Sequence, residues 1–308
     1  MESVFNRFSS KAITHVLILL IIYCLWIWLF VGFRNDHLFL IFFCLSCYFF
    51  HHLTRKFITA FFIFIVYWIV YDAMRVIPNY TVNAVHIREP YDFEKAIFGI
   101  NINHVLLTPN EYFNLHTSTL ADLIAGLFYI NWVPVPLAFA FFLMVKDKIF
   151  FLRFSYAFVL TNFIGFIIYY LYPAAPPWYV SQYGFEFNQH VPASTAGLAR
   201  FDDYFGISLF HSLYSKNANI FAAIPSLHAA YPFVVLYYGL KRKMGWINIL
   251  FVIFLLGIWF AAVYSFHHYI IDLLLGALCA FIGIYLLEHV LLKFPKIKNW
   301  FNNLVGMI

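Results

Sequence analysis

Long apolar runs are the feature of this sequence that most restricts its fold. A membrane-spanning α-helix needs about twenty consecutive, mostly apolar residues, and runs of this kind recur along the chain. Only 11% of the 308 residues are charged, whereas soluble domains carry roughly a quarter. The sequence therefore predicts an all-α fold, a polytopic membrane helix bundle.

We predict about eight spans, with six as the lower limit, because the second run is short and could re-enter the bilayer. The first run follows Arg7 and Lys11, but it is long and lacks a small-residue cleavage site. We interpret it as a span and not as a removable signal. The runs cover residues 12–33, 37–50, 56–74, 120–144, 149–171, 222–240, 245–265 and 269–292.

No sequence repeat or linker divides the chain. We expect a single membrane domain over residues 1–308, with residues 1–75 supplying the N-terminal spans. Two hydrophilic insertions, near 75–119 and 173–221, interrupt the apolar runs.

Basic residues fall mainly on one side of the predicted topology. With eight spans, 13 of the 19 Lys and Arg lie on the same side as both termini. The positive-inside rule places that side in the cytoplasm, so the span ends near His228 and His268 face the periplasm or an organelle lumen. These 13 residues are Arg7, Lys11, Arg55, Lys56, Lys146, Lys148, Arg153, Lys241, Arg242, Lys243, Lys293, Lys296 and Lys298.

The net charge of +5 therefore reflects membrane topology. No basic residues cluster on a solvated face, so nucleic acid is not an expected partner. The lack of a long hydrophilic tail favours a bacterial inner membrane over a Golgi-type membrane.

The start of the last run carries two histidines and a carboxylate, in the string His267-His268-Tyr269-Ile270-Ile271-Asp272. In a helix, His268 and Asp272 share one face, where the carboxylate can fix the imidazole tautomer and stabilise its cation. An aspartate inside an apolar run is costly and marks a functional site by default. The alternative is a structural Asp–His pair that anchors helix ends. We predict that His268 and Asp272 are catalytic.

The string Pro225-Ser226-Leu227-His228 predicts a helix start at the rim of the sixth run. Proline is tolerated in a first helical turn, and a helix N-terminus offers free N–H groups and a positive dipole end to a phosphate. His228 is therefore a catalytic candidate, and Ser226 with its neighbouring amides is a phosphate-binding candidate. The alternative is a histidine that only sits at the membrane interface.

Arg200 and Trp178 come from the second hydrophilic insertion. An arginine fork suits bidentate phosphate binding, so Arg200 is a phosphate-binding candidate, although an ordinary solvated loop residue is the alternative. Three prolines between Tyr172 and Trp178 end the fifth run and leave Trp178 at the interface. Trp178, His267 and Tyr269 are candidate accessory residues of the site.

Together these strings resemble the signature motifs of the type 2 phosphatidic acid phosphatase superfamily. Pro225 to His228 resembles the second motif, and His268 with Asp272 resembles the third. Further strings narrow the resemblance to inositol phosphorylceramide synthases of the fungal type over residues 76–290. These strings are Pro173 to Tyr179, Gly197 to Arg200, Ala223 to His228 and His267 to Leu273. The resemblance implies a six-helix, phosphatase-type catalytic core.

The sequence departs from the phosphatases of that superfamily. Ala261 and Ala262 stand where those enzymes carry Ser-Arg, so the usual phosphate-clamping arginines are missing. Lys146 and Arg153 match the spacing of the first motif, but Phe154 replaces its proline and the predicted topology puts the pair on the cytoplasmic side. A phosphodiester, with one negative charge, suits this site better than a dianionic phosphomonoester.

The resemblance implies a phosphotransferase that moves phosphoinositol from phosphatidylinositol to a ceramide-like lipid and releases diacylglycerol. His268 would attack phosphorus to form a phosphohistidine, and Asp272 would hold its imidazole. His228 would act first as acid and then as base, while Arg200 would bind a phosphate oxygen. No carboxylate cluster suggests a metal, and no cofactor is expected. The lipid substrates are the expected partners, and the sequence defines no accessory subunit.

Two other functions stay open. A lipid phosphate phosphatase of the same superfamily would use the same three residues with water as the acceptor and release inorganic phosphate. A lipid transporter or binding protein would have no need of two histidines and an aspartate in this arrangement. A transporter would also be expected to show paired broken helices in two related halves, and the sequence has no such internal symmetry.

Overall fold

The computed structural model describes residues 8–215 and 219–308 and divides the chain into two compact units. Unit 1 comprises Met1–Ile77 and Pro295–Ile308, and unit 2 comprises Pro78–Phe294. All the site residues predicted from the sequence belong to unit 2. The fold of unit 2 therefore decides whether those residues meet.

Unit 1 is built around a helical hairpin. A single extended residue, His51, joins the two hairpin helices, which pack along each other. The preceding helix begins at Ser10, after its N-cap Ser9, whose hydroxyl accepts the N–H of Ala12. The helices are α2 (Ser10–Trp26) with its π-helical extension η1 (Ile27–Val31), α3 (Asn35–Phe50), α4 (His52–Ala73) and α16 (Pro295–Met307).

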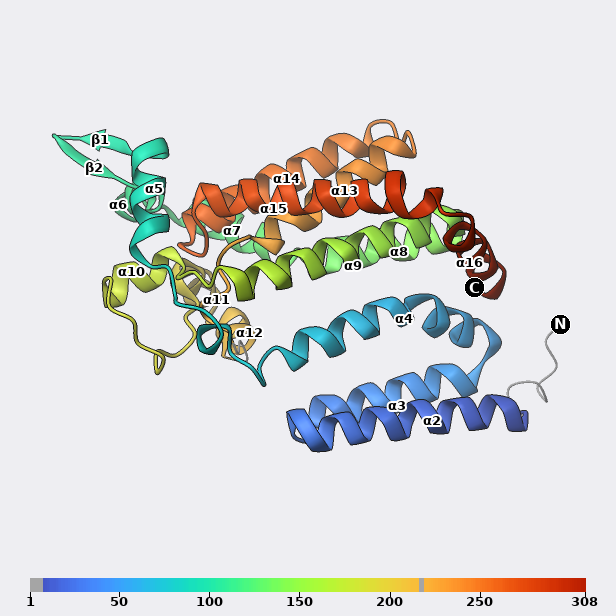
Figure 1. The fold of residues 1–308 in the computed structure, drawn as a ribbon. Helices are drawn as coiled ribbons and strands as arrows, with labels where there is room; N and C mark the ends of the chain where they lie inside the picture. The colour runs from blue at the N-terminus through green and yellow to red at the C-terminus, as the bar shows by residue number, and fades with distance from the viewer. Residues whose placement is uncertain (1–7, 216–218) are drawn as a thin grey trace. The chain divides into compact units, whose positions relative to one another are not determined.

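The described residues of unit 2 contain six bundle helices (Figure 1). α13 lies among α9, α14 and α15, and fully buried alanines on α13 and α14 allow their backbones to approach closely. The bundle helices are α7 (Thr119–Ile130), α8 (Pro134–Lys146), α9 (Lys148–Leu171), α13 (Leu227–Lys241), α14 (Ile247–Tyr264) and α15 (Ile270–Tyr285), which continues into η4 (Leu286–Val290) and η5 (Leu291–Lys293).

The directions of these helices bring four helix ends together. α13 and α15 begin at the end of the bundle where α9 and α14 finish (Figure 1). His228 and Asp272 lie in the first turns of α13 and α15, and His268 lies between α14 and α15. The three predicted catalytic residues therefore share one end of unit 2.

Fewer helices qualify as spans than the eight predicted. Among the described residues, five helices are long and apolar enough to cross a membrane, and a sixth span results if α7 and α8, bent by 41°, act as one. α3 has 16 residues and α13 has 15, both shorter than the usual span. α13 begins only at Leu227, whereas the apolar run was predicted to span from residue 222. The helical membrane architecture holds, and the number eight is not established.

The two hydrophilic insertions fold over the site end of the bundle (Figure 1). Two isolated β-bridges tie them to each other and to the segment before α13, because Ala174 bridges to both His86 and Ala222. The first insertion contains η2 (Asn79–Thr81), α5 (Arg88–Phe98), β1 (Ile100–Ile102), β2 (Val105–Leu107) and α6 (Pro109–Leu115). The second contains α10 (Pro177–Tyr183), η3 (Ala196–Leu198), α11 (Ala199–Phe205) and α12 (Leu209–Tyr214).

The β1–β2 hairpin is a small departure from the predicted all-α fold. Its strands pair antiparallel around Asn103 and His104, which have φ values of 50° and 67°. A two-residue hairpin turn with positive φ at both positions favours asparagine at the first of them. No alternating run was long enough to predict these three-residue strands from the sequence.

Gly276 sets the approach of the two helices that carry His228 and Asp272. A Cβ at this position would fall well inside contact distance of the Ser226 carbonyl oxygen, which is backbone and cannot rotate away. Gly276→Ala should therefore push α15 from α13, lower stability by about 1–3 kcal/mol and reduce turnover. Gly306→Ala is the matched control, because nothing lies within 4 Å of its Cβ position. Thermal unfolding and turnover of both variants test the prediction, and equal behaviour would contradict it.

Candidate active site

Three residues from different parts of unit 2 form a continuous series at the end of the bundle. His228 Nδ1 lies 3.3 Å from His268 Nε2, and His268 Nδ1 lies 3.3 Å from Asp272 Oδ2. His268 Nδ1 is also 3.1 Å from the carbonyl oxygen of Ala223. His268 is 6% exposed and Asp272 is 0% exposed, so the series is shielded from bulk solvent.

The hydrogen bonds fix the tautomer of His268. Its Nδ1 faces a carbonyl oxygen and a carboxylate, both of which accept, so Nδ1 carries the hydrogen. Nε2 is then unprotonated and faces His228. Burial lowers the pKa of His268 to about 4, so the ring is neutral at neutral pH. A neutral imidazole with a free Nε2 is a competent nucleophile.

His268 and Asp272 meet, but not on one helical face as predicted. α15 begins at Ile270, with Tyr269 as its N-cap, so His268 lies outside the helix. Asp272, in the first turn, turns back toward the incoming chain and accepts the N–H of Tyr269 at 2.9 Å. The contact is therefore a capping geometry, in which the loop brings His268 onto the same carboxylate.

A small cavity of about 60 Å³ opens onto the histidines. His267, one of the candidate accessory residues, lines it between the rings of Tyr129 and Tyr214. Trp178 also lines it, whereas Tyr269 is buried beside α15 and does not. The lining residues are Tyr129, Pro176, Trp178, Ala193, Ser194, Tyr214, Asn219, Ile220, Ala222, Ala223, His228, His267 and His268.

A second hollow of about 450 Å³ adjoins the cavity and shares Ala193 and Ile220 with it. Gln189, His211 and Ser215 give this hollow a polar wall. The two spaces together offer room beside the histidines for more than a phosphoryl group.

Ser226, predicted as a phosphate ligand, is not among the residues that line the cavity. Its hydroxyl accepts the N–H of Ala229 as the N-cap of α13, and its own N–H donates to the carbonyl of Asp272 at 2.9 Å. Its amide N–H is thus occupied and its hydroxyl oxygen accepts a bond within the protein, and the residue is fully buried. Pro225 consequently lies just before the cap and not in the first helical turn.

Arg200 lies against the His268 loop but is not among the cavity-lining residues. Its Nε donates to Asp122, and its guanidinium carbon lies 5.1 Å from the centre of the Tyr264 ring. Gly197, on the same segment, donates its N–H to Ser265 at 2.9 Å. Within the described residues, Arg200 Nη2 is buried and makes no hydrogen bond. Arg200 is thus partly engaged and not an ordinary solvated residue.

Arg153 belongs to the opposite end of the bundle. There Arg153 and Lys241 approach Glu288, with Nζ of Lys241 only 2.6 Å from its carboxylate, and Tyr238 donates a further hydrogen bond. The placement supports the interpretation that the first-motif spacing of Lys146 and Arg153 is accidental.

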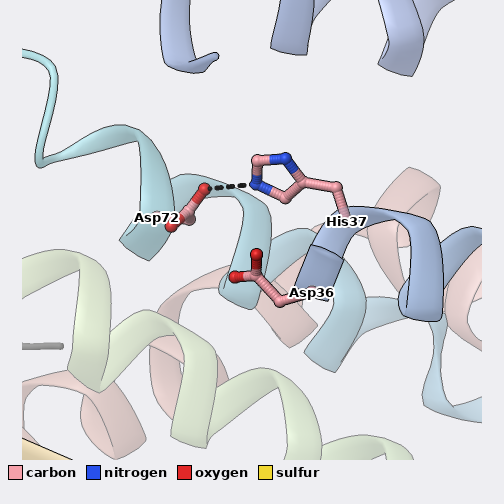
Figure 2. A group of neighbouring side chains, drawn as sticks. All are labelled: Asp36, His37 and Asp72. Carbon is pink, nitrogen blue, oxygen red and sulfur yellow. Dashed lines mark hydrogen bonds and ion pairs between the residues drawn. The ribbon is translucent and has the colours of Figure 1, made fainter. Parts of the chain in front are cut away.

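Unit 1 holds a second cluster of ionisable side chains, drawn in Figure 2. His37 Nε2 lies 3.0 Å from Asp72, and the ligand atoms of Asp36, His37 and Asp72 lie within 4.8 Å of one another. Arg34 pairs with both carboxylates, and Arg75 pairs with Asp72. Two guanidinium groups already balance two carboxylates, so a divalent cation would have to displace Arg34. We interpret the cluster as an ion-pair network that ties α3 to α4.

The two carboxylates of this cluster should differ sharply in their effect on stability. The Asp72 side chain is 7% exposed, whereas that of Asp36 is 50% exposed, although both contact Arg34. Asp72→Ala should lower the free energy of unfolding by about 3 kcal/mol, because it removes the buried carboxylate that Arg34, His37 and Arg75 share. Asp36→Ala, the matched control, should cost below about 1 kcal/mol. Denaturation in detergent, followed by circular dichroism, measures both, and similar losses would refute the network.

Two buried polar residues near the site were missed by sequence analysis. Glu94 accepts the N–H groups of Ile270 and Ile271, and Asn110 donates to the carbonyl of His268. Glu94 lies on the buried side of the amphipathic helix α5 with Pro90, so a carboxylate in an apolar stripe was the available signal. Asn110 offered none.

Asp122 was also missed. It accepts from Arg200 and from the hydroxyl of Tyr264, at 2.8 Å for the latter. Asp122 lies inside the predicted run 120–144, so the rule that singled out Asp272 applies to it equally.

Comparison with known proteins identifies the family of the chain. A family model described as the PAP2 superfamily matches residues 99–286. Phosphoinositol dihydroceramide synthase of Bacteroides thetaiotaomicron is 44% identical over 296 residues, which cover 96% of this chain and 97% of that protein. No solved structure matches the chain.

Fungal proteins are more distant relatives. Inositol phosphorylceramide synthase of Candida albicans is 28% identical over 227 residues, covering 70% of this chain and 43% of that protein. The inositol phosphorylceramide synthase catalytic subunit of Saccharomyces cerevisiae is 30% identical over 196 residues, covering 61% of this chain and 46% of that protein. This chain therefore spans under half the length of these fungal relatives.

The resemblance predicted from the motifs is confirmed. The family match covers more than half of the chain, and the Bacteroides relative aligns with nearly all of it. The chain belongs to the PAP2 superfamily, among the lipid phosphotransferases related to inositol phosphorylceramide synthases.

Proposed function

We propose that this lipid phosphotransferase moves phosphoinositol from phosphatidylinositol to a ceramide-like acceptor through a phosphohistidine and releases diacylglycerol. One observation carries the proposal: Asp272, His268 and His228 form a continuous series that ends at the cavity. The names of the relatives support phosphoinositol as the transferred group and a ceramide or dihydroceramide as the acceptor class.

In the first step, the lone pair on His268 Nε2 attacks phosphorus, and the bond from phosphorus to the glycerol oxygen breaks. Protonated His228, 3.3 Å away, gives its proton to the departing oxygen, so diacylglycerol leaves as a neutral alcohol. Asp272 stabilises the positive charge that develops on the imidazole. The product of the step is a phosphoinositol group on His268.

In the second step, neutral His228 takes the proton from the primary hydroxyl of the acceptor. The acceptor oxygen attacks phosphorus, the bond from phosphorus to His268 Nε2 breaks, and free His268 returns. His228 ends protonated, ready for the next cycle. Side chains supply the nucleophile and both proton transfers, so we propose a mechanism without a metal or cofactor.

Arg200 is the proposed cation for a non-bridging phosphate oxygen. Its buried Nη2 makes no hydrogen bond within the described residues, and its segment runs along the loop that carries His268. One cation suits a phosphodiester, and fully buried Ala261 and Ala262 leave no room nearby for the arginine of the related phosphatases. The adjoining hollow, with Gln189, is the proposed space for the polyol.

We further propose eight spans, with residues 76–290 as the catalytic part, both termini in the cytoplasm and the site on the periplasmic or lumenal face of its membrane. A bacterial inner membrane is the proposed location. The distribution of Lys and Arg supports this orientation.

In a cysteine-free background, Asp203→Cys should react with a membrane-impermeant thiol reagent in intact bacterial cells, and Lys243→Cys should not. The opposite pattern would reverse the orientation.

The decisive assay supplies headgroup-labelled phosphatidylinositol to purified protein in detergent, with and without ceramide. A labelled, base-stable lipid that forms only with ceramide is the expected result, and a chelator should leave the rate unchanged. Release of water-soluble inositol phosphate regardless of ceramide would contradict transfer to that acceptor. Inorganic phosphate from phosphomonoester lipids, with no transfer, would favour the phosphatase alternative.

A further inference from the structure

Glu94 is a buried carboxylate that contacts the catalytic helix from outside it. The residue lies on α5 and is 0% exposed, and no ion pair to it occurs among the described residues. Oε1 accepts the N–H of Ile270 at 2.9 Å, and Oε2 accepts that of Ile271 at 3.2 Å. One side chain thus holds the first two amides of α15 across 176 and 177 residues of sequence.

These two amides need an external acceptor because α15 has a poor N-cap. Its N-cap residue is Tyr269, whereas helices favour Ser, Thr, Asp or Asn there, whose short side chains reach the first-turn N–H groups. The hydroxyl of Tyr269 is buried and makes no hydrogen bond within the described part of the chain. Glu94 supplies from another helix what a capping side chain normally supplies.

Without Glu94, Asp272 is a carboxylate of the same first turn that could accept from these amides. Asp272 is the third residue of the helix, and its Oδ2 already accepts from Tyr269 and lies against His268. A free first-turn amide attracts an anionic side chain, since the helix N-terminus carries partial positive charge. Any rotation of Asp272 toward Ile270 or Ile271 would take its carboxylate away from His268.

We propose that Glu94 is a positioning residue for phosphotransfer: it caps α15 from outside and so keeps Asp272 directed at His268. The proposal rests on the function proposed above, in which His268 is the nucleophile. Glu94 does not line the cavity and is not expected to touch substrate.

The ionisation of Glu94 makes this device sensitive to pH. Burial raises the pKa of Glu94 to about 7, although the two amide hydrogen bonds act in the opposite direction, and the nearby Asp272 raises it further. The ionised carboxylate accepts both N–H groups, one on each oxygen. In the protonated carboxyl group one oxygen carries a hydrogen and no longer serves as an acceptor. The other titratable groups around this site are Tyr269 in the loop, Glu111 on α6, and Tyr91 and Lys95 on α5.

Ionisation of Glu94 has opposite effects on the stability of the protein and on its activity. The pKa of Glu94 is raised above its ordinary value of 4.5, so the folded state binds this proton more tightly than the unfolded state does. Its contribution to stability is greatest below about pH 4.5 and is lost as the pH rises through about 7. The ionised form of Glu94, which holds the site in place, is therefore also the form that lowers the stability of the protein.

A second residue of the first insertion holds the same loop without charge. Asn110 is fully buried, and its Nδ2 donates to the carbonyls of Val263 at 2.8 Å and His268 at 2.9 Å. Its loss should impair the loop in a way that does not depend on pH. Asn110→Ala therefore serves as the uncharged comparison for Glu94.

The test is Glu94→Gln in the full-length protein, assayed for phosphoinositol transfer from pH 5.5 to 8.5. We expect kcat to fall by about 10²-fold with KM changed less than about twofold, because the reacting group is displaced and the substrate contacts are not. The acid limb near pH 7 should disappear from the kcat profile. The difference in melting temperature, Glu94→Gln minus wild type, should increase as the pH rises through 7. Glu89→Gln, on the same helix but with a 64% exposed side chain, should change neither profile.

An acid limb that persists in Glu94→Gln would overturn the proposal. So would a melting temperature lowered equally at pH 5.5 and 8.5, as in the Asn110→Ala comparison, because that is the behaviour of a merely structural contact. If Glu94→Gln does not fold, Glu94→Asp, which keeps a carboxylate, should retain the acid limb, and its loss would refute the assignment. A wild-type protein inactive in transfer would instead reject the proposed function, while the melting comparison would still test the cap.

Discussion

Replacing His268 with alanine should reduce phosphoinositol transfer by at least about 10⁴-fold, because no other group can take over covalent attack on phosphorus. Nε2 of His268 is the unprotonated nitrogen that faces His228, and it lies in the wall of the cavity. The variant should still fold, since the lost imidazole lines the cavity and Asp272 keeps the N–H of Tyr269 as a partner. Its melting temperature and elution volume in detergent should match those of the wild type.

A donor analogue with an acidic phenol as leaving group separates the nucleophile from the general acid. An acidic phenol needs no protonation to depart, so His228→Ala should still release one equivalent of phenol per enzyme and accumulate phosphohistidine. His268→Ala should release none. A retained burst in His268→Ala, or its loss only in His267→Ala, would reject His268 as the nucleophile.

Replacing Asp272 with asparagine should lower turnover by about 10²–10³-fold. The loss should be smaller than in Ser-His-Asp enzymes, where the aspartate alone sets the tautomer of the catalytic histidine. The carbonyl of Ala223 also accepts from His268 Nδ1, at 3.1 Å, so the tautomer should survive the change. The loss would then come from the missing negative charge, which stabilises the imidazolium in both steps.

The spectrum of His268 distinguishes charge from tautomer. In Asp272→Asn, the ¹⁵N shifts of the ring should still show a protonated Nδ1, while phosphohistidine forms more slowly. A switch to protonated Nε2 would mean that Ala223 does not hold the tautomer, and the loss should then approach that of His268→Ala. Turnover within about twofold of the wild type would remove Asp272 from the mechanism.

The helical membrane character and the residue types of the site could be predicted from local sequence. Apolar runs indicate where helices cross the membrane. A carboxylate within such a run has a high free-energy cost and therefore marks a candidate site. The contact of His268 with Asp272 was predicted for the wrong reason. The residues are four apart, yet the contact depends on Asp272 turning back across the first turn of α15.

Local sequence does not say which partners a polar group will find. A serine at a helix start offers a hydroxyl to a phosphate or to its own helix, and Ser226 gives it to Ala229. The length of α13 likewise depends on caps and packing that an apolar run does not encode, whereas α3 is short, as the run 37–50 predicted.

The sequence alone determined that this chain is a bundle of membrane helices, and it singled out the histidines and the aspartate proposed to carry its chemistry, because hydropathy and short motifs are local properties. Only the tertiary structure decided that His228 meets His268 across 40 residues, and that Glu94 caps α15 across 176. These contacts depend on how α5, α13 and α15 pack. Close approach of helices, set by residues such as Gly276 and by buried polar groups that must find a partner, is a property of the whole fold.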